Sequence, residues 1–145
     1  MVTPKDMKQA RVTDSIDHVT EHALQETALT LIPASSVLVV VRGMILAHSF
    51  PTAITDGPVT INQDMKAIRC GDRLPAEYLF WCFTGFAKVL SKMAQESAHG
   101  TRKMETTTLK KFSLPVPPVQ EQELIAKHLR TRMAQLDRMA EAFFR

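Results

Sequence analysis

Short apolar runs separated by turn residues occupy the middle of the chain. The longest run, residues 37–41, reads Val-Leu-Val-Val-Val, and after Arg42-Gly43 a second apolar run covers residues 44–47. Because β-branched residues favour strands and glycine favours a turn, this stretch predicts two strands about a glycine turn. The pattern recurs around the Asp56-Gly57-Pro58 turn, in residues 53–54, 59–61 and 65–68. A small twisted sheet is therefore predicted.

Three stretches outside this sheet predict helices. Thr20 can cap a short helix, because its hydroxyl can accept a backbone N–H and Glu21 suits the first turn. Thr106 can cap another helix of one or two turns. Pro75 fits the first position of a longer helix, whose apolar residues recur at three- and four-residue steps: Leu79, Phe80, Phe83, Phe86, Ala87, Leu90 and Met93. With helices flanking the sheet, the predicted fold class is α/β of the α+β type.

The C-terminal stretch predicts one long helix, because no glycine or proline occurs from Val119 to the end. Its apolar residues follow a heptad spacing at Ile125, Leu129, Met133, Leu136, Ala140 and Phe143. Such a stripe predicts pairing with an equivalent helix, but an amphipathic helix folded onto its own domain would show the same periodicity. The terminal Phe143 and Phe144 favour a partner, since exposed rings gain little on a solitary domain. We therefore divide the chain into a domain of residues 1–118 and a pairing helix of residues 119–145.

The composition fits one globular domain with an appendage. The 145 residues are 45% hydrophobic and carry a net charge of +3. Cys70 and Cys82 form no Cys-x-x-Cys pair, so neither a disulfide framework nor a zinc site is expected, and no metal or cofactor is predicted. The longest purely apolar run is far shorter than the roughly 20 residues that span a bilayer. We expect a soluble, cytoplasmic protein that does not enter membranes.

Positive charge is concentrated between Lys88 and Lys111, where six basic residues face two glutamates. The polar loop of residues 97–103 lies in this stretch and is the best candidate for DNA contact, because arginine can bond bidentately to guanine and glycine lets the backbone approach a phosphate. A solvated basic loop would have the same composition. The candidate DNA-binding residues are His99, Gly100, Thr101, Arg102 and Lys103, with Lys5, Lys8, Arg42, His48 and Lys66 as weaker candidates, mostly for phosphates.

Two short patterns raise the alternative of metal-dependent catalysis. His18-Val19-Thr20-Glu21-His22 matches the His-x-x-Glu-His pattern of inverted zinc peptidases, but a helix cap at its threonine would leave the first histidine outside the helix. Asp56, Asp64 and Lys66 would suit a nuclease in which two acids hold a divalent ion and a lysine steadies the attacking water. The turn around Asp56 already explains that acid, so the nuclease is a minor alternative.

Three further stretches carry a family resemblance when they are read in order. The first comprises residues 3–8, 19–24 and 31–33, and the second is Ile61-Asn62-Gln63-Asp64-Met65-Lys66-Ala67, which precedes a Pro-x-x-Tyr-Leu helix at residues 75–79. The third is the proline-rich junction of residues 109–122, which ends in Gln120-Glu121-Gln122. Together they resemble one target-recognition domain, with its spacer helix, of a type I restriction-modification specificity subunit. The first strands of that family, which precede residue 3, are absent here.

This resemblance implies recognition of double-stranded DNA without catalysis. A specificity subunit recognises one half of a bipartite site, while separate modification (methyltransferase) and restriction subunits methylate and cleave. Its long helix would set the gap between half-sites and dock the modification subunit, and two chains could pair as a homodimer through it. In agreement, the sequence holds no glycine-rich turn for S-adenosylmethionine and no phosphate-binding loop. The alternative from another class is a protein-interaction module that dimerises through residues 125–143 without specific DNA binding.

Overall fold

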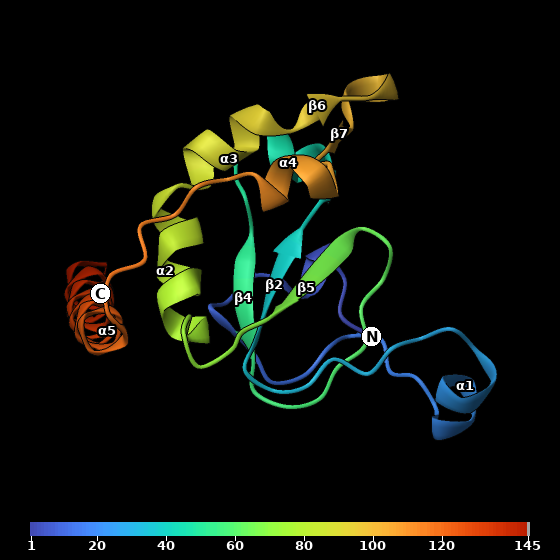
Figure 1. The fold of residues 1–145 in the computed structure, drawn as a ribbon, viewed down its shortest axis with the longest axis horizontal. Helices are drawn as coiled ribbons and strands as arrows, with labels where there is room; N and C mark the ends of the chain where they lie inside the picture. The colour runs from blue at the N-terminus through green and yellow to red at the C-terminus, as the bar shows by residue number, and fades with distance from the viewer. Residues whose placement is uncertain (145) are drawn as a thin grey trace.

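A computed structural model of the chain describes residues 1–144, apart from the side chain of Ala98. Its main sheet has four strands in the spatial order β1 (Arg11–Val12), β4 (Thr52–Thr55), β2 (Ser36–Val40) and β5 (Met65–Arg69). β2 is antiparallel to both β4 and β5, and β1 runs parallel to β4 (Figure 1). The central strand is thus the valine-rich run from which the sequence predicts a sheet.

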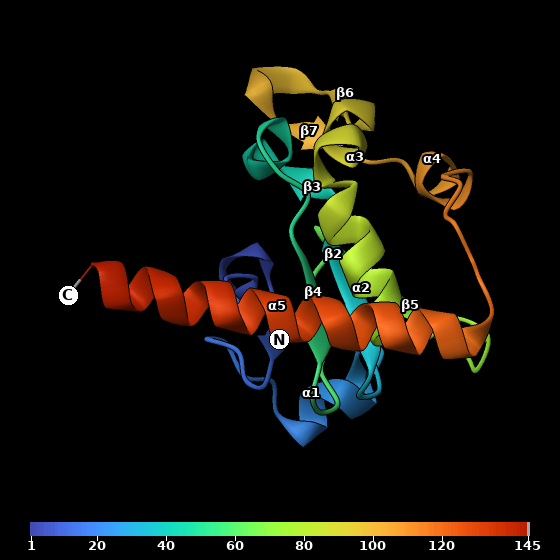
Figure 2. The ribbon, with the colours of Figure 1, turned by 90° about the vertical axis from the view of Figure 1, so that its left-hand side faces the viewer.

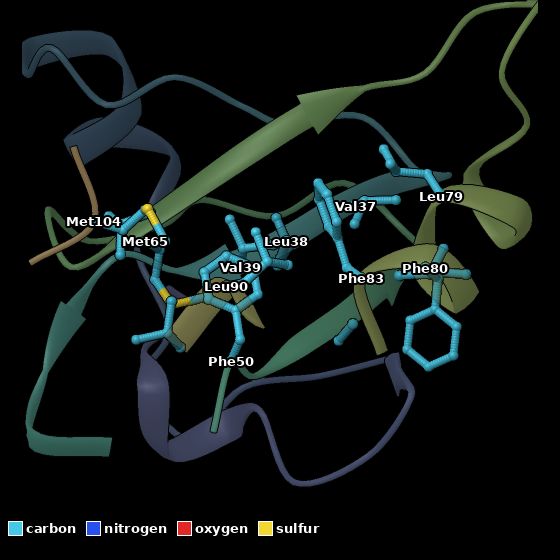
Figure 3. Close-up of a cluster of buried hydrophobic side chains, with 14 of the residues drawn as sticks. Val37, Leu38, Val39, Phe50, Met65, Leu79, Phe80, Phe83, Leu90 and Met104 are labelled. Carbon is cyan, nitrogen blue, oxygen red and sulfur yellow. The ribbon is translucent and has the colours of Figure 1, made fainter. Parts of the chain in front are cut away.

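The hydrophobic core surrounds β2, whose five residues are all buried. Figure 3 shows side chains from β2 and β5 meeting side chains from residues 79–90, together with Phe50 and Met104, in this core. Phe50 and Phe83 meet edge to face, with ring centroids 5.9 Å apart. A strand buried on both faces loses the apolar-polar alternation of a half-exposed strand, which accounts for the continuous apolar run at 37–41.

A second, three-stranded sheet continues directly from β2. Its strands lie in the order β3 (Arg42–Gly43), β7 (Arg102–Lys103) and β6 (Gln95–Glu96). Only Val41 separates β2 from β3, and its carbonyl accepts a bond of 2.8 Å from the Met104 N–H. The prediction of a turn at Arg42-Gly43 is wrong, because these residues pair with β7, which lies 59 to 61 positions later in the sequence.

The prediction of a strand at residues 44–47 is also wrong, since they form the 3-10 helix η2 (Met44–Ala47). Gly43 has a φ of 142°, a backbone region that side chains disfavour, and this conformation turns the chain out of β3. Of the four residues in η2 only Leu46 is buried, so this segment does not show the alternately buried residues of a strand. The predicted strand at 59–61 is reduced to isolated bridges, Ile32 with Val59 and Val2 with Ile61.

The helices other than the C-terminal one are short. The helix predicted from Pro75 onward is two helices, α2 (Ala76–Gly85) and α3 (Ala87–Met93). The break between them is at Phe86, which has a φ of −92° and a ψ of 8°. Pro75 is the residue before the first turn of α2. Thr20 caps its helix as predicted, because its hydroxyl accepts the Ala23 N–H. The prediction that Thr106 caps a helix is wrong, because the helix begins at Thr106 itself and Glu105 is the residue before it. The remaining helices are α1 (Glu21–Glu26), α4 (Thr106–Lys110), and the single 3-10 turns η1 (Pro4–Asp6) and η3 (Ala98–Gly100).

The long C-terminal helix α5 (Val119–Phe143) confirms the prediction of one helix from residue 119 onward. Figure 2 shows its first half lying across α2 and its C-terminal end extending past the rest of the molecule. Gln122 is fully buried at the start of α5, and its Nε2 donates to the Pro117 carbonyl at 2.7 Å and to the Arg73 carbonyl at 3.2 Å. Arg130 adds a two-oxygen ion pair with Glu77 of α2, at 2.7 and 2.8 Å. These contacts fix the direction of α5 relative to the sheet domain.

Candidate nucleic-acid interface

The small sheet brings together three predicted cationic residues from distant parts of the sequence. Arg42 of β3 lies directly opposite Lys103 of β7, and residues opposite each other in an antiparallel pair point to the same face. Both side chains, with Lys66 of β5, line a hollow of about 180 Å³. The walls of this hollow also include Val41, Gln63, Met104, Glu105 and Thr106. We call Arg42, Lys66 and Lys103 the cationic cluster.

The charges of the cationic cluster are only partly neutralised. Like charges directly opposite in a sheet are destabilising, and one carboxylate lies close by: Glu105 Oε1 is 2.8 Å from Lys103 Nζ. Within the part of the chain that the structure describes, Arg42 and Lys66 make no ion pair. A ligand with negative charge would relieve the repulsion that remains.

A second hollow of about 380 Å³ adjoins the cationic cluster and shares Arg42 and Lys103 with it. Ser97 and Thr101, which close the β6–β7 hairpin through the Ser97 N–H and the Thr101 carbonyl at 2.7 Å, line its remaining walls. Hydroxyl donors beside guanidinium and ammonium groups are the usual partners of phosphate oxygens. This face of the small sheet therefore has the chemistry of a phosphate site.

The opposite face of the small sheet carries a different set of groups. Arg102 lies opposite Gly43 on one side and Glu96 on the other, so these three positions share a face. Arg102 is half-buried, and among residues 1–144 it makes no ion pair within 4.0 Å. Its guanidinium keeps donors for a ligand on the side away from the cationic cluster.

The tip of the hairpin consists of residues 98–100. His99 and Gly100 have φ values of 60° and 75°, in the left-handed region. Glycine adopts this region without strain, so the tight tip explains the glycine at this place. Residues 97–103, predicted as one loop, thus form the turn and the second strand of a hairpin, and Figure 1 shows the hairpin at the edge of the molecule.

The predicted contact residues fall into two groups in space. His48 directly follows η2, which packs against β7, so it lies on the side of the small sheet. Lys5 and Lys8 line a separate hollow of about 260 Å³, together with Arg11. Gln63, which lines the hollow at the cationic cluster, is not among the contact residues predicted from the sequence. The signal for it is weak, because a neutral polar residue in a turn has no distinctive pattern.

The structure disfavours both metal-dependent alternatives. His18 lies outside α1 and contacts the Asp14 carboxylate at 2.9 Å, while His22 contacts Glu26 at 3.1 Å. Asp56 follows the C-terminal end of β4, whereas Asp64 precedes the N-terminal end of β5, so the sheet register separates these acids to opposite ends. In the described residues no group of three or more His, Cys, Asp or Glu side chains is arranged to hold a metal ion.

The two cysteines behave as small apolar residues. Burial raises the pKa of the Cys70 thiol and of the Cys82 thiol, so both favour the protonated form. Neither forms a disulfide.

Of the helices described, none has the length and apolar character needed to cross a membrane.

The predicted pairing residues of α5 form one continuous stripe with two different environments. Ile125 and Leu129 are half-buried on the half of α5 that contacts α2. Farther along, Met133, Leu136, Ala140 and Phe143 are exposed, with Leu136 56% and Phe143 92% accessible. The alternative of a helix folded onto its own domain therefore describes the first half of α5. The second half is uncovered, and its pairing with an equivalent helix stays a prediction.

Comparison with known proteins identifies the family. A family model of the type I restriction modification DNA specificity domain matches residues 1–140, so the chain belongs to this family. It is 32% identical over 128 residues to the type I restriction enzyme EcoR124I/EcoR124II specificity subunit of Escherichia coli, and 28% identical over 130 residues to the MjaIX specificity subunit of Methanocaldococcus jannaschii. These alignments cover 88% and 86% of this chain but 32% and 29% of the two relatives, so the chain spans about a third of their length.

Two solved structures share the fold. The HsdS subunit from Thermoanaerobacter tengcongensis superposes with a TM-score of 0.73 at 19% identity, over 97% of this chain and 30% of that one. A chain from a structure of a type I R-M system gives a TM-score of 0.66 at 22% identity, over 78% of this chain and 26% of that one. The predicted α/β class and the long C-terminal helix are thus confirmed.

Proposed function

We propose that this chain recognises one half of a bipartite DNA site for a type I restriction-modification system and leaves methylation and cleavage to other subunits. Membership of the DNA specificity domain family supports this assignment. The observation that carries it is the cationic cluster, which lies beside a hairpin with further polar side chains. A positive site flanked by hydroxyl and amide groups suits the sugar-phosphate backbone of a duplex.

In this proposal the two faces of the small sheet have different roles. The cationic cluster binds phosphates and fixes the register of the protein on the duplex, which carries no sequence information. Arg102 and the hairpin tip reach base edges, where sequence is read. Lys5, Lys8 and His48 supply further phosphate contacts outside the cationic cluster.

Duplex binding is expected to weaken steeply with salt. Each phosphate contact contributes about 0.9 to the slope of log affinity against log salt, so three contacts lower the affinity roughly 40-fold between 50 and 200 mM salt. Fluorescence anisotropy with a labelled duplex, in the presence of the modification subunit, measures this slope. The alternative function, a protein-interaction module that does not bind DNA specifically, predicts no dependence of this kind, and a flat response would support that alternative.

An Arg102→Ala variant is expected to relax the preference at one base position. Loss of a bidentate contact to guanine costs about 1–3 kcal/mol of discrimination, whereas contacts elsewhere in the site are unaffected. Selection of bound sites from a random duplex pool, with the modification subunit present, measures the preference. Arg138→Ala, which removes the same charge from the exposed side of α5, is the matched control. An unchanged selected motif for Arg102→Ala would contradict the role of this residue.

We further propose that residues 1–118 read the DNA and residues 119–145 set the spacing of the half-sites; Arg145 lies outside the described residues. The uncovered stripe of α5 supports pairing with an equivalent helix, supplied by a second copy of the chain or by a further segment of the same protein. The flank of the paired helices would bind the modification subunit, through which the restriction subunit is recruited to the same DNA. The chain itself needs no cofactor for these roles.

A further inference from the structure

The helix η2 presents two adjacent apolar side chains to solvent beside the small sheet. Met44 is 67% exposed and Ile45 43% exposed, whereas Leu46, the next residue, is completely buried. Single exposed apolar residues are common on protein surfaces, but an adjacent pair on a cationic surface calls for an explanation. The sequence gives no hint of this arrangement, because an apolar run of four residues predicts burial.

The apolar pair is held in a fixed position. Leu46 anchors η2 in the hydrophobic core, and the helix packs against both β7 and α3. The backbone N–H groups of His48 and Ser49 both donate to the Ile45 carbonyl at 3.0 Å, which closes the turn. Figure 2 shows η2, the teal segment after β3, and the hairpin tip projecting on the same side of the molecule. The pair is therefore part of a rigid surface that also contains the hairpin.

The position of Ile45 can be assigned to one face of the small sheet. A Cβ atom built on Gly43 would lie 3.8 Å from Ile45 Cγ2, so the isoleucine side chain occupies the space that a side chain at position 43 would otherwise face. Gly43 lies directly opposite Arg102, and opposite residues share a face. Ile45 consequently lies on the face that carries Arg102 and Glu96, away from the cationic cluster.

This face combines a guanidinium, a carboxylate and an apolar surface. In the major groove these groups correspond to the acceptors of guanine, the amino group of cytosine and the C5-methyl group of thymine. We infer that Met44 and Ile45 contact the C5-methyl group of a thymine in the recognised half-site. The inference rests on the proposed DNA-binding function. The small sheet carries three cations, Arg42, Arg102 and Lys103, against the carboxylate of Glu96, and this net positive charge favours a duplex over an apolar protein surface as the occupant.

Thymine-to-deoxyuridine replacement tests this contact, because it removes only the methyl group. Using the full chain with the modification subunit, each thymine of the selected site is replaced in turn and the affinity is measured. Loss of one buried methyl group is expected to weaken binding about fourfold at one thymine or at two neighbouring ones. The Met44→Gln, Ile45→Thr double variant is expected to bind the two duplexes equally. Val116→Gln, a similar change at a 58% exposed position in the segment before α5, should keep the fourfold difference.

The outcomes separate this inference from the proposed function. If the unchanged protein selects a site but no thymine replacement affects its affinity, or if the selected site contains no thymine, the methyl contact is wrong while DNA recognition stands. If the double variant keeps the thymine preference but binds the modification subunit more weakly, the apolar pair belongs to a protein contact and the inference fails. If no sequence preference appears at all, before any base is replaced, the proposed function itself fails.

Discussion

Replacing Arg42 and Lys66 together by alanine is expected to weaken binding to every duplex, cognate or not, by roughly 30-fold at 0.15 M salt. Two lost phosphate contacts lower the salt slope by about 1.8, and the 30-fold factor is this slope applied between 1 M and 0.15 M. Both side chains are exposed at the rim of a hollow, so the change leaves the core intact. Anisotropy titrations at several salt concentrations measure the affinity and the slope together.

The matched control for this double variant is Lys127→Ala with Arg138→Ala, which removes two exposed cations from α5. These residues lie away from the small sheet, and we expect the salt slope to remain as in the unchanged protein. Site selection with the Arg42, Lys66 variant should return the same motif at lower yield. A changed motif would mean that these residues contact bases, and an unchanged salt slope would mean that the duplex binds elsewhere.

The second large effect concerns the uncovered stripe of α5. Leu136→Glu with Phe143→Glu is expected to abolish pairing between two copies of the chain. Burial of a leucine or phenylalanine side chain contributes about 1.5–3 kcal/mol, and a symmetric helix pair loses two such contacts on each helix. Analytical ultracentrifugation at micromolar concentration should then give the mass of one chain in place of two.

Gln135→Glu with Ala142→Glu places the same charges on the opposite side of α5 and serves as the control. This variant should pair as the unchanged chain does. If the unchanged chain sediments as a monomer at all concentrations, the stripe pairs with some other helix and a second copy is not its partner. If Leu136→Glu with Phe143→Glu still pairs, the stripe is not the interface.

Elements with a strong local signal could be predicted from the sequence. The valine-rich strand β2, the Thr20 helix cap and the long helix α5 each follow from residue preferences within a single segment. The small sheet could not be predicted, because strands of two residues have no measurable periodicity. Its pairing of Arg42 with Lys103 also joins segments that are far apart in the chain.

The candidate site shows the same limit. Arg42, Lys66 and Lys103 could be named from the sequence as cations of suitable chemistry, but their common hollow depends on the register of two sheets. Met44 and Ile45 were expected in a strand, because apolar runs normally signal burial. Their exposure follows from the conformation of Gly43 and from the anchoring of Leu46, which only the fold reveals.

The direct passage from β2 into β3 has a thermodynamic consequence. Val41 alone separates the two strands, and it is held by bonds from its N–H to the Asp64 carbonyl and from the Met104 N–H to its own carbonyl, both 2.8 Å long. No flexible linker lies at this junction, so the small sheet takes its shape together with the core. The entropy of ordering this surface is lost when the chain folds and does not have to be lost again on association. The heat-capacity change of complex formation then reports the surface buried between the two molecules, without a contribution from coupled folding of this junction.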